Sequence, residues 1–150
     1  MNNTEIRNRI IEILEGLDRP GTEAVINYLK TSSYFNRGCY GHHKEQGGLA
    51  KHSLEVYEHM IAFAEGLSSD SIAVAALLHD LGKTTRSGGK GHAHRSLNIL
   101  DKLWFQLCDD EKIAIGNHHD FSFDFFSCPL RRALSIADCR STGDWKQQHR

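Results

Sequence analysis

The sequence predicts an all-α fold, a single compact bundle of about six or seven helices. Apolar residues recur at helical spacing through most of the chain. No segment shows the alternating, β-branched pattern between tight turns that indicates a strand. Internal repeats and linkers rich in glycine, proline or charge are also absent from the sequence. We therefore expect residues 1–150 to form one domain, with N-terminal helices in residues 1–31 and the core in residues 40–140.

Composition narrows the class of protein. The chain has 150 residues, of which 39% are hydrophobic and 25% charged, as in ordered globular proteins. A formal net charge of −1 gives no general attraction to duplex nucleic acid, which is not an expected partner. No apolar run has transmembrane length and the first residues do not resemble a signal peptide, so we expect a cytoplasmic protein with no membrane partner. The cysteines lack metal-site or redox spacing and are expected to be reduced: Cys39, Cys108, Cys128 and Cys139.

Two helices are expected in the first 31 residues. Thr4 is the predicted cap of the first helix, which ends at the turn of residues 18–21. Thr22 is the predicted cap of the second helix. Residues 31–48 then lose the helical period and contain several glycines, which indicates a long ordered loop.

The remainder of the chain predicts five more helices. The helix expected in residues 71–80 is apolar nearly all round, which is typical of a central buried helix, and it ends at the pair His79-Asp80. The helix expected in residues 49–65 carries His52 on its apolar face. The five expected ranges are residues 49–65, 71–80, 94–107, 110–119 and 130–139.

Ten histidines are the unusual feature of the composition, and their positions indicate a metal site. A charged Asp80 beside His79 at the inner end of a buried helix is unfavourable unless a cation or hydrogen bonds compensate it. Neighbouring helical residues point about 100° apart, so such a pair can share an ion only at a helix end. Imidazole and carboxylate ligands together suit Mn, Fe, Co, Ni, Zn or Mg. The alternatives are a capped helix end and a plain interaction domain with coincidental histidines.

Several segments resemble the HD superfamily of metal-dependent phosphohydrolases. The order His52, His79-Asp80, Asp138 is similar to its H…HD…D signature. Residues 47–56 resemble the family's G-G-L-x-x-H-[ST]-L-x-V segment, residues 79–83 its H-D-[IL]-G-K segment, and residues 137–138 its closing A-D. The run with His42 and His43 before Gly47 is similar to the HD domain of bacterial 3′-to-5′ exoribonuclease-like proteins. The resemblance implies an HD-like helical bundle.

The resemblance also implies a ligand set for one or two divalent metal ions. His52, His79, Asp80 and Asp138 would hold the first ion. His92 and His118, with or without His119, would hold a second ion, with Asp80 bridging the two. These residues are the candidate metal ligands.

The implied activity is cleavage of a phosphoester of a nucleotide or another small phosphorylated substrate by metal-activated water. Asp80, Lys83 and His119 are the candidate catalytic residues, with Lys83 meeting the phosphate and His119, or His118 if it is not a ligand, passing a proton. Lys83 and Arg131 are the candidate substrate contacts, although either could be an ordinary solvated cation.

Two functional alternatives stay open. The substrate could be RNA. The protein could instead be a non-catalytic regulatory domain that binds metal or nucleotide. Motifs typical of guanosine-tetraphosphate hydrolases and cyclic-dinucleotide phosphodiesterases are missing, so those substrates are not expected. A cluster of phenylalanines in residues 121–126 could stack a base, join the core or support a homo-oligomer.

Overall fold

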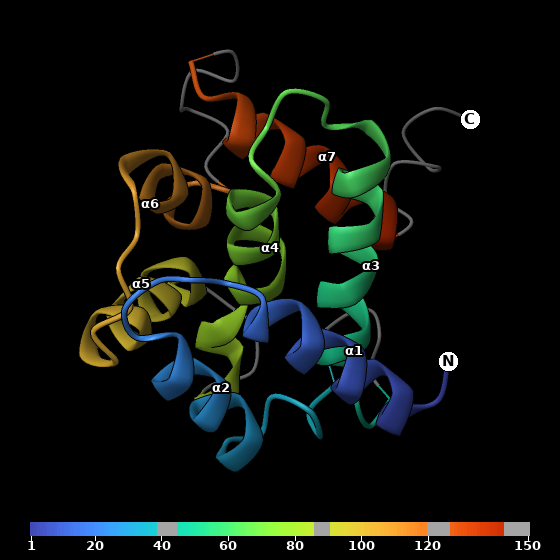
Figure 1. Cartoon of the computed structure of the whole chain (residues 1–150). Helices are drawn as coiled ribbons and strands as arrows, with labels where there is room; N and C mark the ends of the chain where they lie inside the picture. The colour runs from blue at the N-terminus through green and yellow to red at the C-terminus, as the bar shows by residue number, and fades with distance from the viewer. Residues whose placement is uncertain (39–44, 86–90, 120–126, 143–150) are drawn as a thin grey trace.

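The computed structural model describes residues 1–38, 45–85, 91–119 and 127–142, and in these residues it contains helices and no strand. The all-α prediction is confirmed. Figure 1 shows the arrangement of the helices. They are α1 (Asn3–Glu15), α2 (Thr22–Thr31), α3 (Gly48–Phe63), α4 (Ser69–Leu78), the 3₁₀ helix η1 (Leu81–Thr84), α5 (His92–Lys102), α6 (Asp109–Gly116) and α7 (Pro129–Thr142).

Helix α4 lies at the centre of the bundle, as its apolar composition predicts. All residues from Ile72 to Leu78 are buried, and α4 packs against α1, α3, α6 and α7. Ser68 caps its N-terminus by accepting a hydrogen bond from the backbone N–H of Ser71 at 3.3 Å. Because α4 ends inside the bundle, the polar pair that follows it is placed among other helices and away from solvent.

The N-terminal helices pack on the same core as α3 and α4. Ile6, Ile10 and Leu14 of α1 and Val25 and Leu29 of α2 are all buried in one apolar cluster. That cluster also contains Leu49 of α3 and Leu77 and Leu78 of α4. None of the helices in the described part of the chain is long and apolar enough to cross a membrane.

The helix caps of α1 and α2 differ from the prediction. The N-cap of α1 is Asn2, whose Oδ1 accepts from the backbone N–H of Glu5 at 2.8 Å, and Thr4 lies inside the helix. The N-cap of α2 is Gly21, while the Thr22 hydroxyl donates to the Arg19 carbonyl at 2.8 Å. Gly21 has a φ of 90°, and a Cβ there would lie 2.6 Å from the Cα of Phe105. Contact with a distant segment therefore requires glycine at this cap.

Helix α5 begins two residues before its predicted start and ends before its predicted end. Trp104 adopts a left-handed φ of 58°, and its N–H bonds to the carbonyl of Asp101 at 3.0 Å. The N–H of Phe105 bonds to the carbonyl of Leu100 at 3.0 Å. These two hydrogen bonds end the helix in a Schellman motif, in which glycine usually occupies the left-handed position. The apolar residues at 103 and 107 continue the helical spacing, but the backbone has already left the helix.

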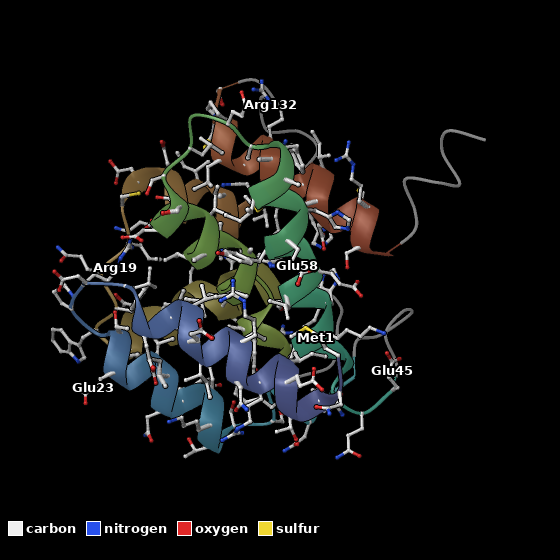
Figure 2. All side chains as sticks on the ribbon, turned by 45° about the vertical axis from the view of Figure 1, so that its right-hand side comes forward. Met1, Arg19, Glu23, Glu45, Glu58 and Arg132 are labelled. Carbon is white, nitrogen blue, oxygen red and sulfur yellow. The ribbon has the colours of Figure 1, made fainter. Side chains whose placement is uncertain are left out.

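A partly buried ion pair joins the turn after α1 to α6. Arg19, labelled in Figure 2, donates from Nη1 to Oε1 of Glu111 at 2.6 Å and from Nη2 to Oε2 at 3.0 Å. Glu111 also accepts from the Ser71 hydroxyl at 2.8 Å and from the backbone N–H of Cys108 at 3.0 Å. Burial raises the pKa of Glu111, but these hydrogen bonds, that from Arg19 first, outweigh burial and lower the pKa.

Replacing Glu111 with glutamine is expected to lower the free energy of unfolding by about 2 kcal/mol at neutral pH. A carboxyl group whose pKa is lowered on folding stabilises the folded state above its unfolded pKa. The difference between the two proteins should therefore shrink as the pH falls below the ordinary value of 4.5. Urea unfolding at several pH values measures it. The matched control is Glu12→Gln, which removes an exposed pair with Arg9 and should change stability little.

Candidate metal centre

Three helices and the turn after one of them bring four predicted ligands together. His52 lies on α3, His79 is the C-cap residue of α4, Asp80 follows at the start of η1, and Asp138 lies on α7. One ligand atom from each side chain lies within 4.8 Å of the others, and all four residues are buried. We refer to these four residues as the first group.

The distances between the ligand atoms of the first group are those expected for side chains arranged around one metal position. Nε2 of His52 lies 2.8 Å from Oδ1 of Asp138 and 3.5 Å from Oδ2 of Asp80. Nε2 of His79 lies 3.3 Å from Oδ2 of Asp80 and 3.6 Å from Oδ1 of Asp138. Within the described residues, Nε2 of His79 and Oδ1 of Asp80 are buried and make no hydrogen bond. Buried polar atoms seldom go without a partner, and imidazole with carboxylate is a suitable donor set for a divalent cation. The residues therefore fit such an ion.

The electrostatics of the first group favour positive charge at its centre. Burial lowers the pKa of His79, but the carboxylates of Asp80 and Asp138 outweigh burial and raise it to about 10. Burial raises the pKa of Asp80, but the charge of His79 outweighs it and holds that pKa well below the ordinary value. Asp138 follows the same pattern, with its contacts to His52 and His79 outweighing burial. Two ionised carboxylates in the core thus attract a proton or a cation.

A second group consists of His92, His118 and His119, whose ligand atoms also lie within 4.8 Å of one another. His92 is the first residue of α5, and the other two follow the C-terminal end of α6. The Nε2 atoms of His92 and His118 face each other at 3.1 Å. Because ring nitrogens at this distance either share a hydrogen or share a cation, the geometry suits a second metal ligand set.

Asp80 lies between the two groups, one carboxylate oxygen toward each. Oδ2 faces His52 and His79, as described above. Oδ1 lies 3.4 Å from Nε2 of His92 and 3.5 Å from Nε2 of His118. This orientation is the one that a bridging ligand needs.

Main-chain hydrogen bonds orient two of the imidazoles. Nδ1 of His79 lies 2.8 Å from the Ala76 carbonyl, and Nδ1 of His118 lies 2.7 Å from the Ile115 carbonyl. A carbonyl can only accept, so each Nδ1 carries the hydrogen. The lone pair of a neutral ring is then on Nε2, which points to the group.

His119 is the exposed member of the second group. Its side chain is 50% exposed, and its Nε2 lies 3.5 Å from Oδ2 of Asp138. Burial of part of the ring, and then the charge of His118, lower its pKa to about 4. His119 is therefore neutral near pH 7 in the metal-free protein, a state in which it can offer a lone pair but not a proton. Its predicted role as a proton donor stays a prediction.

Lys83 lies next to the candidate metal ligands. Its Nζ is 3.2 Å from Oδ2 of Asp80, and the residue is only 7% exposed. The turn that carries it is held from both sides: the Gly82 N–H donates to the Ser96 hydroxyl at 2.7 Å, and the Arg37 guanidinium donates to the Thr84 carbonyl at 3.1 Å. Lys83 is thus an ordered cation beside Asp80, and the reading as a solvated helix-end cation does not fit its burial.

Arg131 is placed differently from what its predicted role requires. It is 1% exposed, and its Nε donates to the Asn117 carbonyl at 3.1 Å. Ser135, one turn later on α7, donates to the His118 carbonyl at 3.1 Å. These contacts tie α7 to the backbone at His118, which favours a supporting role. Substrate binding by Arg131 stays a prediction.

Other candidates lie away from the site or outside the described residues. His94 is exposed and His59 is half-buried. His42, His43 and the phenylalanines at 121–126 lie outside the described residues. Among the described cysteines, Cys108, Cys128 and Cys139 form no disulfide, and Cys39 lies outside the described residues.

The sequence prediction gave no role to three polar residues near the site. Ser96 lies one helical turn after His92, Glu55 one turn after His52, and Ser141 one turn after Asp138. A search for polar side chains one turn from each candidate ligand, on the same helix face, would have found them.

Comparisons with known proteins agree with this geometry. A family model described as the HD domain matches residues 49–142, more than half of the chain and all seven candidate ligands. Ribonuclease Y of Mycoplasma genitalium is 37% identical in an alignment over 91 residues that covers 58% of this chain and 18% of that protein. The chain therefore spans less than a fifth of the length of this relative. No solved structure matches the chain. From the family match and the converging ligands we conclude that the chain belongs to the HD domain family.

Proposed function

We propose that the protein is a metal-dependent phosphohydrolase that cleaves a phosphoester of a nucleotide or another small phosphorylated substrate. The observation that carries the proposal is the position of Asp80, with one oxygen toward each of two imidazole-rich groups. A carboxylate between two ligand sets is the arrangement that a pair of divalent cations requires. Such cations, when bound, would supply an activated water molecule and neutralise phosphate oxygens.

The residues of the chain have distinct tasks in this proposal. The first group would hold one ion in the core, and the second group would hold the other near the surface, where His119 is half-exposed. Lys83 would bind a phosphate oxygen. Its pairing with Asp80 at 3.2 Å keeps its positive charge beside the candidate metal ligands, where a phosphate would bind.

The relative suggests a narrower substrate class. By its name, ribonuclease Y cleaves RNA, whose backbone is a phosphodiester. A nucleotide or a short oligoribonucleotide with a phosphodiester bond is therefore the first substrate to test. The net charge of −1 does not favour long nucleic acid.

The test is hydrolysis by the purified chain with Mn²⁺, Co²⁺, Ni²⁺ or Mg²⁺. Substrates would include nucleotides, short oligoribonucleotides, a phosphodiester with a chromogenic leaving group and the corresponding monoester. We expect turnover by the wild type with at least one metal, and none by a His79→Ala/Asp80→Ala variant. If the wild-type protein hydrolyses nothing above the blank, the enzymatic proposal fails.

Calorimetry separates the proposal from a non-catalytic regulatory domain. Tight binding of metal and nucleotide without turnover would support the regulatory role. Elemental analysis of protein purified without a histidine tag would test the metal by itself. Protein with no bound metal, and with no affinity for added metal, would contradict both roles.

A further inference from the structure

His52 is oriented by a side chain from another helix. Its Nδ1 lies 3.0 Å from Oγ of Ser141, in the last turn of α7. Oγ of Ser141 in turn donates to Oε2 of Glu55, on α3, at 2.7 Å. A serine hydroxyl has one hydrogen, and here it is used on the carboxylate. Oγ can then only accept from His52, so Nδ1 of His52 carries the hydrogen.

This hydrogen-bond chain determines which ring nitrogen can bind a cation. With the hydrogen on Nδ1, the lone pair of the neutral ring lies on Nε2, which points toward Asp80 and Asp138. His79 and His118 reach the same state through carbonyls of their own helices. His52 reaches it through a contact between α3 and α7, which a point mutation can remove without changing either backbone.

Helix α7 contacts His52 at both nitrogens. Asp138 lies 2.8 Å from Nε2, and Ser141, one turn later, lies 3.0 Å from Nδ1. The ring is therefore held between two residues of one helix face. Its position relative to the metal ligands depends on how α7 packs against α3.

We propose that Ser141 and Glu55 are positioning residues that orient His52 for metal binding in the first group. The inference rests on the proposed function only in requiring that the first group binds a cation. A carboxylate that reaches a metal-binding imidazole through a hydroxyl raises the basicity of that imidazole and limits its rotation. Loss of such a partner typically weakens metal affinity by about 10- to 100-fold.

The experiment measures metal affinity and needs no substrate. Co²⁺ is titrated against a competing chelator and followed by its visible absorption in wild type, Ser141→Ala, Ser141→Thr and Glu55→Gln. We expect about tenfold weaker binding or more for Ser141→Ala, a smaller loss for Glu55→Gln, and near wild-type affinity for Ser141→Thr, which keeps the hydroxyl. The controls are Ser69→Ala and Glu58→Gln, both exposed, with Glu58 labelled on α3 in Figure 2. Neither control should change the affinity.

A second measurement tests the hydrogen bond in metal-free protein. With ¹⁵N-labelled histidine, the Nδ1 hydrogen of His52 should exchange slowly with water in the wild type and the threonine variant, and faster in the alanine variant. Unchanged Co²⁺ affinity together with unchanged exchange in Ser141→Ala would overturn the proposal, as would an equal loss of affinity in the controls. If the wild type binds no Co²⁺, the proposed function fails, and the exchange measurement still tests the orientation of His52.

Discussion

An Asp80→Asn protein is expected to lose metal from both groups and to lose hydrolysis by at least about a hundredfold. Asparagine keeps the shape of the side chain but removes the charge, and it replaces one acceptor oxygen with a donor. Because the two oxygens of Asp80 face different groups, a single substitution affects both. Elemental analysis and turnover with added metal measure the two effects.

His92→Ala is the comparison for this prediction. His92 belongs to the second group, and its Nε2 lies near Oδ1 of Asp80, not Oδ2. This variant should keep metal in the first group and lose it from the second. Equal metal content in Asp80→Asn and wild-type protein would contradict the bridging role of Asp80.

Gly82→Ala is expected to lower the free energy of unfolding by about 3 kcal/mol, near the upper end of the range for overpacking. A Cβ at Gly82 would lie 2.2 Å from the backbone oxygen of His92 and 2.9 Å from the backbone nitrogen of Ser96. These atoms belong to the first turn of α5 and cannot rotate away. The turn after Asp80 and the start of α5 would have to separate, which would also move His92 away from Asp80.

Thermal or urea unfolding measures the stability loss, and Co²⁺ titration measures the loss of the second ion. Gly16→Ala is the matched control, because Gly16 has right-handed backbone angles and its Cβ would meet only the Ile13 carbonyl, at 3.3 Å. That variant should remain close to wild type in both measurements. A Gly82→Ala protein with wild-type stability would show that the contact between η1 and α5 is not close in solution.

Periodicity predicted the helices well because helical order is local. The apolar run before His79 predicted a buried central helix, and α4 is buried from Ile72 to Leu78. The unfavourable position of Asp80 at the end of that run predicted compensation by a cation or by hydrogen bonds. The family motifs then selected the ligands, which the structure places in two groups.

Helix ends were predicted less well because distant residues decide them. Thr22 was a reasonable cap by residue type, yet the N-cap of α2 is Gly21, where the backbone of Phe105 leaves no room for a side chain. Helix α5 ends at Lys102, with Leu103 as its C-cap, although apolar residues continue the period, since Trp104 turns into the left-handed region. Neither contact is visible in the local pattern.

By itself the sequence determined the all-α class and the central helix, since both depend on residue type and short-range spacing, and its resemblance to a known family implied the candidate ligands. The family resemblance implied a bridging Asp80, and the tertiary structure places one of its oxygens toward each group. The tertiary structure alone decided that Arg131 supports the backbone before His118 and that Ser141 orients His52. These relations join residues that lie on different helices or turns. They depend on ångström-scale helix packing, and a one-dimensional pattern does not contain such distances.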